Sequence, residues 1–600
     1  MGRFSSLFLV TAVLLTAATA AAADTEGINL YKGWRLAEFR VEGLDRSLSD
    51  RLVSGLALPS RIKRVGINRP LLYPAVVEED LRRTLLFLAR NGFPRAEARA
   101  RAEKTGGARN VRIVFSIDPG PPVLVSTFAV EGFPPPLELA VRRRAPLRAG
   151  ERFTEEKVVE AARVAEETLR DSGYARGAVE HMVERDGEES VRVLIRADPG
   201  NVCFFGDFHV EGAAEDLVPL VRKTVSLPRG ERYSPDRVRR SGSAVRMLGL
   251  FRRIRMETVD GNADTLHLLA DLAERRSRTV DLDIAYWTDD LLRGSVRWEH
   301  RNLLRRGRGG AVEVSASRYR QNAATSLWWP ALFRPRLRGS LSLSAAREWE
   351  ESYDLTNLSF RLGALHRASE RVVLSGDLSF SRVDVNDKTG ERDAFIEEGG
   401  LLGALHVEWR RDGRDDRIDP RGGTVAFAAW EWSPPGPWTA SPFLSTEVSL
   451  AGFLPLFARS TLAGRATLGV ARPLGDSPDL LPNKRFYSGG ANRMRGFRRR
   501  KLGPLDEDGA PIGGEAKAEF SLEGRFPLFW RLRGALFADA GAVWSDRGSI
   551  DWRDLETAFG PGLMVKTPIG PIRADLGYRA GDRIADQPRW VFHFSIGNPF

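Results

Sequence analysis

From about residue 277 to its end, this 600-residue chain alternates apolar and polar side chains in many short runs. Examples are VDLDIAY at 280–286, VEVSAS at 312–317 and LSLSA at 341–345. Since successive side chains of a β-strand point to opposite faces, each run predicts a strand with one apolar and one polar face. This region contains no run of about 18 apolar residues, so it offers no transmembrane helix. Two structures remain: a soluble sheet with one buried face, or a membrane barrel with lipid outside and water inside.

The distribution of tryptophan favours the membrane barrel. Of the 14 Trp residues, only Trp34 precedes residue 276, and the others run from Trp287 to Trp590. Trp is typical of the headgroup region of a bilayer, where it forms girdles around membrane barrels. We therefore predict a 16-stranded antiparallel transmembrane β-barrel at 277–600, with a soluble all-β domain as the alternative. Candidate strands begin near residues 278, 291, 309, 322, 336, 354, 369, 396, 423, 441, 457, 515, 531, 558, 569 and 588.

The first residues predict export. Arg3, an apolar run at 7–18 and the small residues 21–23 have the layout of a secretory signal peptide over 1–23, with a retained membrane anchor as the alternative. The net charge of +11 suits either nucleic acid or lipid headgroups. Export favours the membrane, so we expect no nucleic-acid partner. The single Cys excludes a disulfide scaffold, and with only 7 His a metal centre is not expected. We therefore expect no cofactor.

Between these regions the chain contains an internal repeat. The sequences FRVEG at 39–43, FAVEG at 128–132 and FHVEG at 208–212 each open a strand that is followed by helical periodicity and two more strands. We expect three α+β domains of β-α-α-β-β order at 24–120, 121–200 and 201–276. Nothing in them indicates catalysis. Their exposed sheet edges could accept a strand from another chain.

Four motifs in the barrel region complete the pattern. They are DGRDDRIDPRGG at 412–423, RMRGF at 493–497, FADAG at 537–541 and WVFHFSIGNPF at 590–600. Behind three repeats, this order resembles the BamA/TamA superfamily of outer-membrane assembly and translocation proteins, and the three repeats are similar to the polypeptide-transport-associated (POTRA) domains of the TamA branch. Met494 stands where the family usually has Val.

The resemblance implies a location, a function and partners. The barrel would lie in the cell outer membrane with the POTRA domains in the periplasm. The clients would be unfolded outer-membrane or autotransporter-like polypeptides. A TamB-like partner anchored in the inner membrane would dock on the POTRA domains. The terminal strand would act as a β-signal.

The long connection at 474–514 is a candidate functional loop, since loops of this length are uncommon without a function. Period two directs Glu523 and Asp539 into the lumen. We expect Arg495 to form charge-assisted hydrogen bonds with both carboxylates and so to hold the loop, with its Gly496 and Phe497, inside the barrel. Gly541 would leave room for the loop. The alternative for the basic run 498–501 is contact with solvent or lipopolysaccharide phosphates.

The seam between the first and last strands is the second candidate site. A strand at 280–287 must pair with one at 590–600 to close the barrel. Pro599 cannot donate to the ladder, so pairing either fails there and leaves a gate or simply stops at the chain end. Leu282, Phe594, Gly597 and Phe600 are the expected gate and β-signal residues.

These features predict assembly or export of β-rich clients through a lateral opening between the first and last strands. A polypeptide-secretion pore of the two-partner-secretion type is the alternative. We expect no enzyme, because no Ser/His/Asp order, HExxH or GxSxG motif occurs. His593 is isolated in the sequence and is expected to be structural.

Overall fold

The structure is a computed structural model that describes residues 27–62, 71–106, 109–262, 264–388, 400–529, 531–567, 570–581 and 587–596. The expected signal peptide and the gate residues Gly597, Pro599 and Phe600 lie outside the described residues. The chain divides into two compact units, one of residues 1–207, 227–238 and 258–268 and one of residues 208–226, 239–257 and 269–600. None of the helices in the described ranges is long and apolar enough to cross a membrane.

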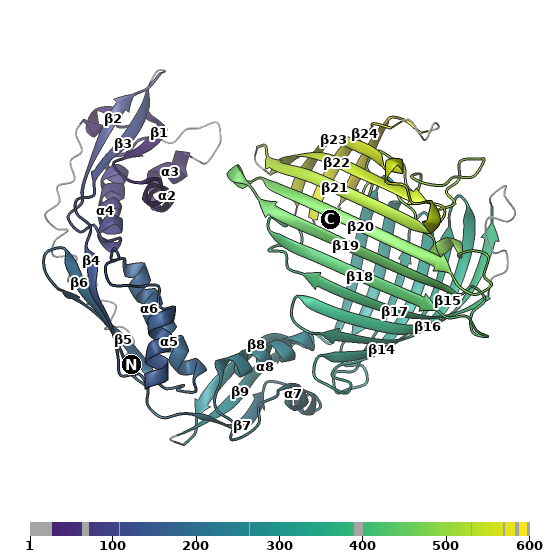
Figure 1. The fold of residues 1–600 in the computed structure, drawn as a ribbon, viewed down its shortest axis with the longest axis horizontal. Helices are drawn as coiled ribbons and strands as arrows, with labels where there is room; N and C mark the ends of the chain where they lie inside the picture. Colours follow the sequence, from purple (N-terminus) through teal and green to yellow (C-terminus); the bar gives the residue numbers. More distant parts are fainter. Residues whose placement is uncertain are drawn as a thin grey trace. The chain divides into compact units, whose positions relative to one another are not determined.

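Three α/β repeats precede the barrel, each with a three-stranded sheet (Figure 1). The second and third have the expected β-α-α-β-β order. In the first two, the last strand lies in the middle of the sheet and pairs in parallel with the first. The elements are β1 Arg35–Glu42, α2 Arg46–Gly55, α3 Ala57–Ile62, α4 Pro74–Arg90, β2 Glu97–Lys104, β3 Asn110–Asp118, β4 Leu124–Glu131, α5 Pro135–Arg144, α6 Glu155–Asp171, β5 Ala178–Arg185, β6 Ser190–Asp198, β7 Phe204–Glu211, α7 Val218–Thr224, α8 Pro235–Met247, β8 Phe251–Asp260 and β9 Thr265–Glu274.

The first repeat differs from expectation by one helix, α3. The backbone N–H groups of Ala57 and Leu58 donate to the two carboxylate oxygens of Asp80, at 3.0 and 2.8 Å. Asp80 lies on α4 and is fully buried. A carboxylate at a helix N-terminus satisfies amides that would otherwise lack partners, so this contact stabilises a helix too short for periodicity to reveal.

The helices are held by the apolar stripes that their sequences predict. In α6, Val158, Ala165 and Leu169 are fully buried against the sheet of the second repeat. Thr154 caps the helix by accepting from the Lys157 N–H at 3.3 Å. Gly173 follows the helix at φ 89°, the left-handed conformation typical of the residue after a helix end.

Residues 278–596 form a closed barrel of sixteen antiparallel strands, which confirms the predicted fold class. All sixteen start close to their expected positions. The strands are β10 Arg278–Trp287, β11 Leu291–His300, β12 Gly309–Ala316, β13 Arg320–Trp329, β14 Leu337–Trp349, β15 Tyr353–Arg367, β16 Val372–Asp387, β17 Gly400–Asp412, β18 Gly423–Ser433, β19 Phe443–Pro455, β20 Thr461–Pro473, β21 Ala516–Pro527, β22 Leu532–Trp544, β23 Glu556–Thr567, β24 Gly570–Arg579 and β25 Trp590–Ile596.

The two faces of the barrel have opposite chemistry. Apolar side chains point outward, and those of Leu282 and Ile284 are 72% and 78% exposed. Charged side chains such as Glu523, Arg525 and Asp539 are buried inside. A soluble sandwich would bury the apolar face instead, so the arrangement fits lipid outside and polar groups within.

Within the second unit, the third repeat contacts three hairpin turns on the side of the barrel where β10 begins. These turns follow β11, β13 and β15. The hydrogen-bonded pairs, at 3.0, 3.0 and 2.9 Å, are Asp216 with the Asn302 amide, Lys223 with the carbonyl of Ala331, and Ser243 with Glu370. We call this the repeat side of the barrel and the opposite end the far side.

Candidate functional site

The connection between β20 and β21 enters the barrel lumen and is held there by Arg495. We call residues 474–515 the luminal loop. Arg495 is 2% exposed, and its guanidinium donates to Asp539 from Nε at 2.8 Å and from Nη2 at 2.7 Å. Nη1 donates to Glu523 and Nη2 also reaches Ser521 at 3.1 Å. The structure thus brings together the three residues that the sequence proposed, in a bidentate geometry that only arginine can provide.

Arg495 is part of a larger buried ionic cluster. Glu523 also accepts from Arg525 at 2.6 Å and from Arg573 at 2.9 Å, and Arg573 in turn bonds Asp575. The cluster contains three guanidiniums and three carboxylates, and its members lie on the luminal loop, β21, β22 and β24. Each side chain is at most 3% exposed. Removing one partner from such a network leaves a buried charge uncompensated, which costs about 3–5 kcal/mol.

Sequence reasoning found half of this cluster. Arg525 lies two residues after Glu523 on the same strand, so period two directs it inward as well without naming its partner, and Arg573 and Asp575 were missed. A signal was present, because both alternate with Ile572, Ala574 and Leu576 along one strand. Period two places them inward but cannot say which luminal group they meet.

Apolar contacts seat the tip of the loop beside the cluster. Met494 and Phe497 are fully buried with Leu502 and Ala558. A Cβ atom on Gly541 would lie 3.1 Å from the Met494 sulfur, so this glycine leaves room for the loop. Gly496 lies against Ala558 of β23.

Gly577 on β24 is a further glycine on which the loop depends. A Cβ atom there would meet the carbonyl oxygen of Arg495 at 1.9 Å, closer than any real contact. This glycine was not expected from the sequence, because nothing local distinguishes it from other strand glycines.

The basic run 498–501 contacts the barrel wall. Arg499 donates to both carboxylate oxygens of Glu350 at 2.6 and 2.7 Å. Arg500 donates to the hydroxyl of Tyr353 at 3.0 Å, and Lys501 pairs with Glu351. These partners lie at the far-side turn between β14 and β15. The alternative of a run facing solvent or phosphates is therefore wrong for these three side chains, while Arg498 is exposed.

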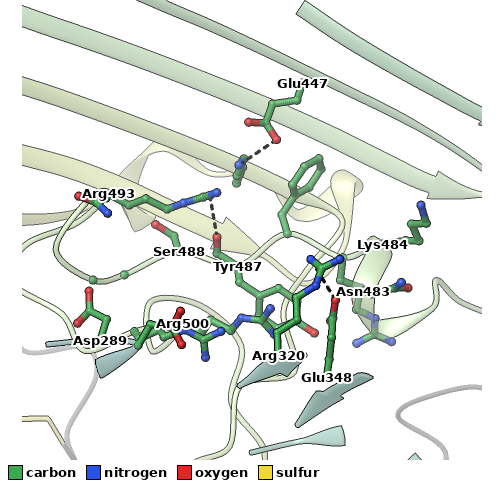
Figure 2. Close-up of a pocket in the computed structure, with 18 of the residues that line it drawn as sticks. Asp289, Arg320, Glu348, Glu447, Asn483, Lys484, Tyr487, Ser488, Arg493 and Arg500 are labelled. Carbon is green, nitrogen blue, oxygen red and sulfur yellow. Dashed lines mark hydrogen bonds and ion pairs between the residues drawn. The ribbon is translucent and has the colours of Figure 1, made fainter. Parts of the chain in front are cut away.

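Residues of the luminal loop and of the barrel strands line a polar cavity of about 790 Å³ (Figure 2). Figure 2 shows Asp289, Tyr487, Ser488 and Arg493 around it, with Arg320 paired to Glu348 at 3.4 Å. Ser488, which lines the cavity, donates to Glu519 at 2.6 Å. Loop residues such as Tyr487, Ser488 and Arg493 thus form part of the cavity wall.

The seam between β10 and β25 is the weakest junction described. Among the described residues, the register of β10 with β25 contains one pair, Trp287 with Ser595, whereas β10 pairs with β11 over its full length. The Thr288 N–H adds a hydrogen bond to the Phe594 carbonyl at 3.0 Å. The ring of Phe594 also packs edge-on against Tyr286. Among the described residues, β10 from 278 to 286 has no registered partner on β25, and residues 597–600, with which this register would continue, lie outside the described residues.

The register changes one detail of the gate. Leu282 was expected to lie opposite Phe594, or near it in register. Because Trp287 pairs with Ser595, Phe594 instead lies beside Thr288. Leu282 lies on β10 with its side chain outward. Period two specifies the face of a strand but not its register against a strand 300 residues away.

His593 connects the luminal loop to both sides of the seam. It is 1% exposed on β25, and its Nε2 donates to the Arg495 carbonyl at 2.9 Å. Its Nδ1 lies 3.5 Å from Asp289 at the turn after β10. Asp289 also accepts from the Ala491 N–H of the loop. The first hairpin, the last strand and the loop therefore meet at one buried point.

Comparisons with known proteins agree with this architecture. Residues 302–600 match the model of the Omp85 superfamily domain. The outer membrane protein assembly factor BamA of Neisseria meningitidis is 24% identical over 72% of this chain and 61% of its own length. A SAM50-like protein of Drosophila melanogaster is 26% identical over 51% of this chain and 73% of its own length.

A solved structure shares the fold. The crystal structure of BamA from Haemophilus ducreyi lacking POTRA domains 1–3 superposes with a TM-score of 0.61 at 16% identity, covering 79% of this chain and 99% of that one. The matches to three BamA proteins span 54–61% of the length of those relatives.

Proposed function

We propose that this protein, whose residues 302–600 match the Omp85 superfamily domain and which is similar to BamA, assembles β-rich outer-membrane proteins by opening the seam between β10 and β25. The barrel lies in the outer membrane with its N-terminal repeats in the periplasm. Clients would be unfolded outer-membrane or autotransporter-like polypeptides. The mechanism needs no cofactor and no covalent chemistry.

The single observation that carries the proposal is the short seam. One registered pair joins β10 to β25 among the described residues, while each neighbouring pair of strands is joined over at least seven residues. Unpaired backbone amides are costly at membrane depth, so a β10 edge exposed by opening of this seam would recruit a strand able to pair with it. A client strand would add to this edge and leave the amides of both strands satisfied.

The loop geometry favours lateral passage over the secretion pore. A polypeptide crossing the lumen would have to displace Arg495 and its buried partners, which costs several kcal/mol for each separated charge. Among the described residues, opening the seam separates one registered pair and the contacts around Thr288 and Phe594. This difference favours the lateral route.

A covalent seam tests the proposal. The variant Trp287→Cys with Ser595→Cys, made in a Cys203→Ser background, places two cysteines on directly paired residues. The control pair, Leu282→Cys with Val296→Cys, joins β10 to β11 and leaves the seam free. Both are expressed in cells depleted of the native protein, and the outer-membrane proteins are inventoried with and without reductant.

We expect the seam disulfide to stop client assembly and reductant to restore it, with the control pair active throughout. Full assembly with the seam locked would contradict the lateral route. A secretion pore would instead keep working with the seam locked and would lose one secreted client while outer-membrane proteins stayed normal.

We extend the proposal to the TamA branch and a TamB-like partner anchored in the inner membrane. The support is the presence of three repeats and the edge position of β2 and β5 in their sheets. A photocrosslinker at Arg101 on β2 should capture an inner-membrane-anchored protein. Capture of client polypeptides alone would contradict this extension and leave the seam proposal intact.

A further inference from the structure

Three turns on the repeat side of the barrel share a short sequence. They read Leu332-Phe333-Arg334, Leu456-Phe457-Ala458-Arg459 and Leu528-Phe529-Trp530-Arg531. They follow β13, β19 and β21, each of which runs toward the repeat side. Each turn therefore combines a Leu-Phe pair with an arginine one or two residues later, and none contains an acidic residue.

The phenylalanines of these turns are among the most exposed apolar side chains described. Phe333, Phe457 and Phe529 are 77%, 85% and 68% exposed. Phe333 has this exposure although Lys223 of the third repeat contacts the backbone of the same turn. The repeat therefore does not cover it. Exposed large apolar residues grouped at one level of a protein mark an interaction surface.

The arginines give this surface a positive charge. Arg334 and Arg459 are exposed, and among the described residues neither is recorded in an ion pair. A guanidinium binds phosphate oxygens through two parallel hydrogen bonds. When the phenylalanine ring of a turn is inserted among the acyl chains of a bilayer, the neighbouring arginine would reach a lipid phosphate.

The outward apolar band of the barrel continues into these turns. Leu454 at the end of β19 is 57% exposed, and Leu456 and Phe457 follow it directly. Leu536 is 60% exposed on β22, the strand that follows the turn containing Phe529. The turns therefore stand at the boundary where hydrocarbon gives way to headgroups.

A fourth turn on the same side provides a contrast. The turn between β17 and β18 contains Asp415, Asp416 and Asp419 beside three arginines, and it lacks a Leu-Phe pair. Asp415 and Asp416 accept backbone N–H groups of their own turn. The charged side chains and internal hydrogen bonds of this turn suit contact with water rather than with lipid.

We propose that the three Leu-Phe-Arg turns bind anionic phospholipid headgroups of the periplasmic leaflet. The phenylalanines enter the upper acyl region and the arginines bind the phosphates. The surface holds the repeat side of the barrel at a defined depth and concentrates anionic lipid around it. This lipid preference is independent of how clients enter the membrane.

Spin labels test the depth of the turns. Single cysteines at Phe333→Cys, Phe457→Cys and Asp416→Cys, in the Cys203→Ser background, are labelled in the full chain in phosphatidylcholine nanodiscs containing phosphatidylglycerol. Labels at 333 and 457 should be accessible to oxygen and shielded from an aqueous nickel chelate, and the label at 416 should show the opposite. Aqueous exposure of the first two labels, or dipolar broadening between two copies of the chain, would overturn the proposal.

A lipid-retention measurement tests the charge. Native mass spectrometry compares retained phosphatidylglycerol with phosphatidylcholine of the same acyl chains. An arginine near a membrane surface contributes about 1 kcal/mol, so Arg334→Gln with Arg459→Gln should reduce the preference for phosphatidylglycerol about 20-fold or more. The matched control, Arg417→Gln with Arg421→Gln on the acidic turn, should retain it. Equal retention of both lipids by the unaltered protein, or equal losses in both variants, would overturn the proposal.

Discussion

His593 and the luminal carboxylates hold opposite ends of Arg495. The imidazole binds the backbone carbonyl oxygen at 2.9 Å, and Asp539 binds the guanidinium from the other side at 2.7 Å. His593 belongs to the last strand, so the residue that fixes the loop inside the barrel is also bonded to one side of the seam. A movement of β25 at this point must stretch the bond to Arg495 or carry the loop with it.

Replacing His593 should uncouple the loop from the last strand. The variant His593→Phe keeps a ring of similar size but leaves the Arg495 carbonyl without its donor, a loss of about 1–3 kcal/mol. Limited proteolysis within 474–515 should become faster while the barrel stays folded by heat-modifiable migration. The control Phe592→Leu changes an outward side chain on the same strand and should leave the rate unchanged. Equal protection in His593→Phe and the unaltered protein would contradict the coupling.

Arg495→Ala should release the luminal loop. Leaving Glu523 and Asp539 without this partner costs about 3–5 kcal/mol, which raises the open population of the loop about 100-fold or more. Protease accessibility of the loop should rise by that order, and client assembly should fall. Arg495→Lys should restore little, because an ammonium cannot bond Asp539 through two parallel donors. The control Arg498→Ala removes an exposed charge of the same loop. Unchanged loop protection and full assembly in Arg495→Ala would refute the assignment.

Gly577→Ala should displace the loop without altering any charge. The added methyl would lie 1.9 Å from the Arg495 carbonyl, so either the strand or the loop must move. We expect the loop proteolysis rate to approach that of Arg495→Ala. Gly524→Ala on β21 is a matched control, because a Cβ atom at Gly524 has nothing within 4 Å. If both glycine variants behave alike, close approach at Gly577 is not what holds the loop.

The contact between Asp216 of the third repeat and the turn after β11 should weaken only at acidic pH. The hydrogen bond from Asn302 is the largest cause holding the pKa of Asp216 below its ordinary value of 3.8. Since the folded pKa is depressed, the carboxylate stabilises the contact above the ordinary value, and this contribution is lost as the pH falls through the lower folded pKa. The protection factor of the Arg306 amide, which donates to Asp216 at 3.0 Å, should stay constant from about pH 8 to 5 and fall as the pH drops below the ordinary value of 3.8.

In Asp216→Asn this acid transition should disappear, because the amide does not titrate. The contact itself should weaken at every pH, since a charge-assisted bond has been replaced by a neutral one. An acid transition of the same midpoint in the variant would assign the titration to another group.

The accuracy of the sequence prediction followed the range of the interactions. Strand positions and the inward direction of Glu523 and Asp539 were predictable, because alternation along a strand is a local property. The third helix of the first repeat was missed, since it depends on Asp80, which lies 22 residues from Leu58. Arg573 was missed as a partner of Glu523 because the two lie 50 residues apart on strands that are not neighbours in the barrel.

By itself, the sequence determined the repeats, the sixteen strands and which side chains face the lumen, because each follows from periodicity within a few residues. Only the tertiary structure decided the register of β10 against β25, the convergence of His593 and Asp289 on the luminal loop, and the six-membered ionic cluster. Those contacts form when barrel closure brings distant strands together, and a pattern of period two is the same whichever strand, and whichever register, lies opposite.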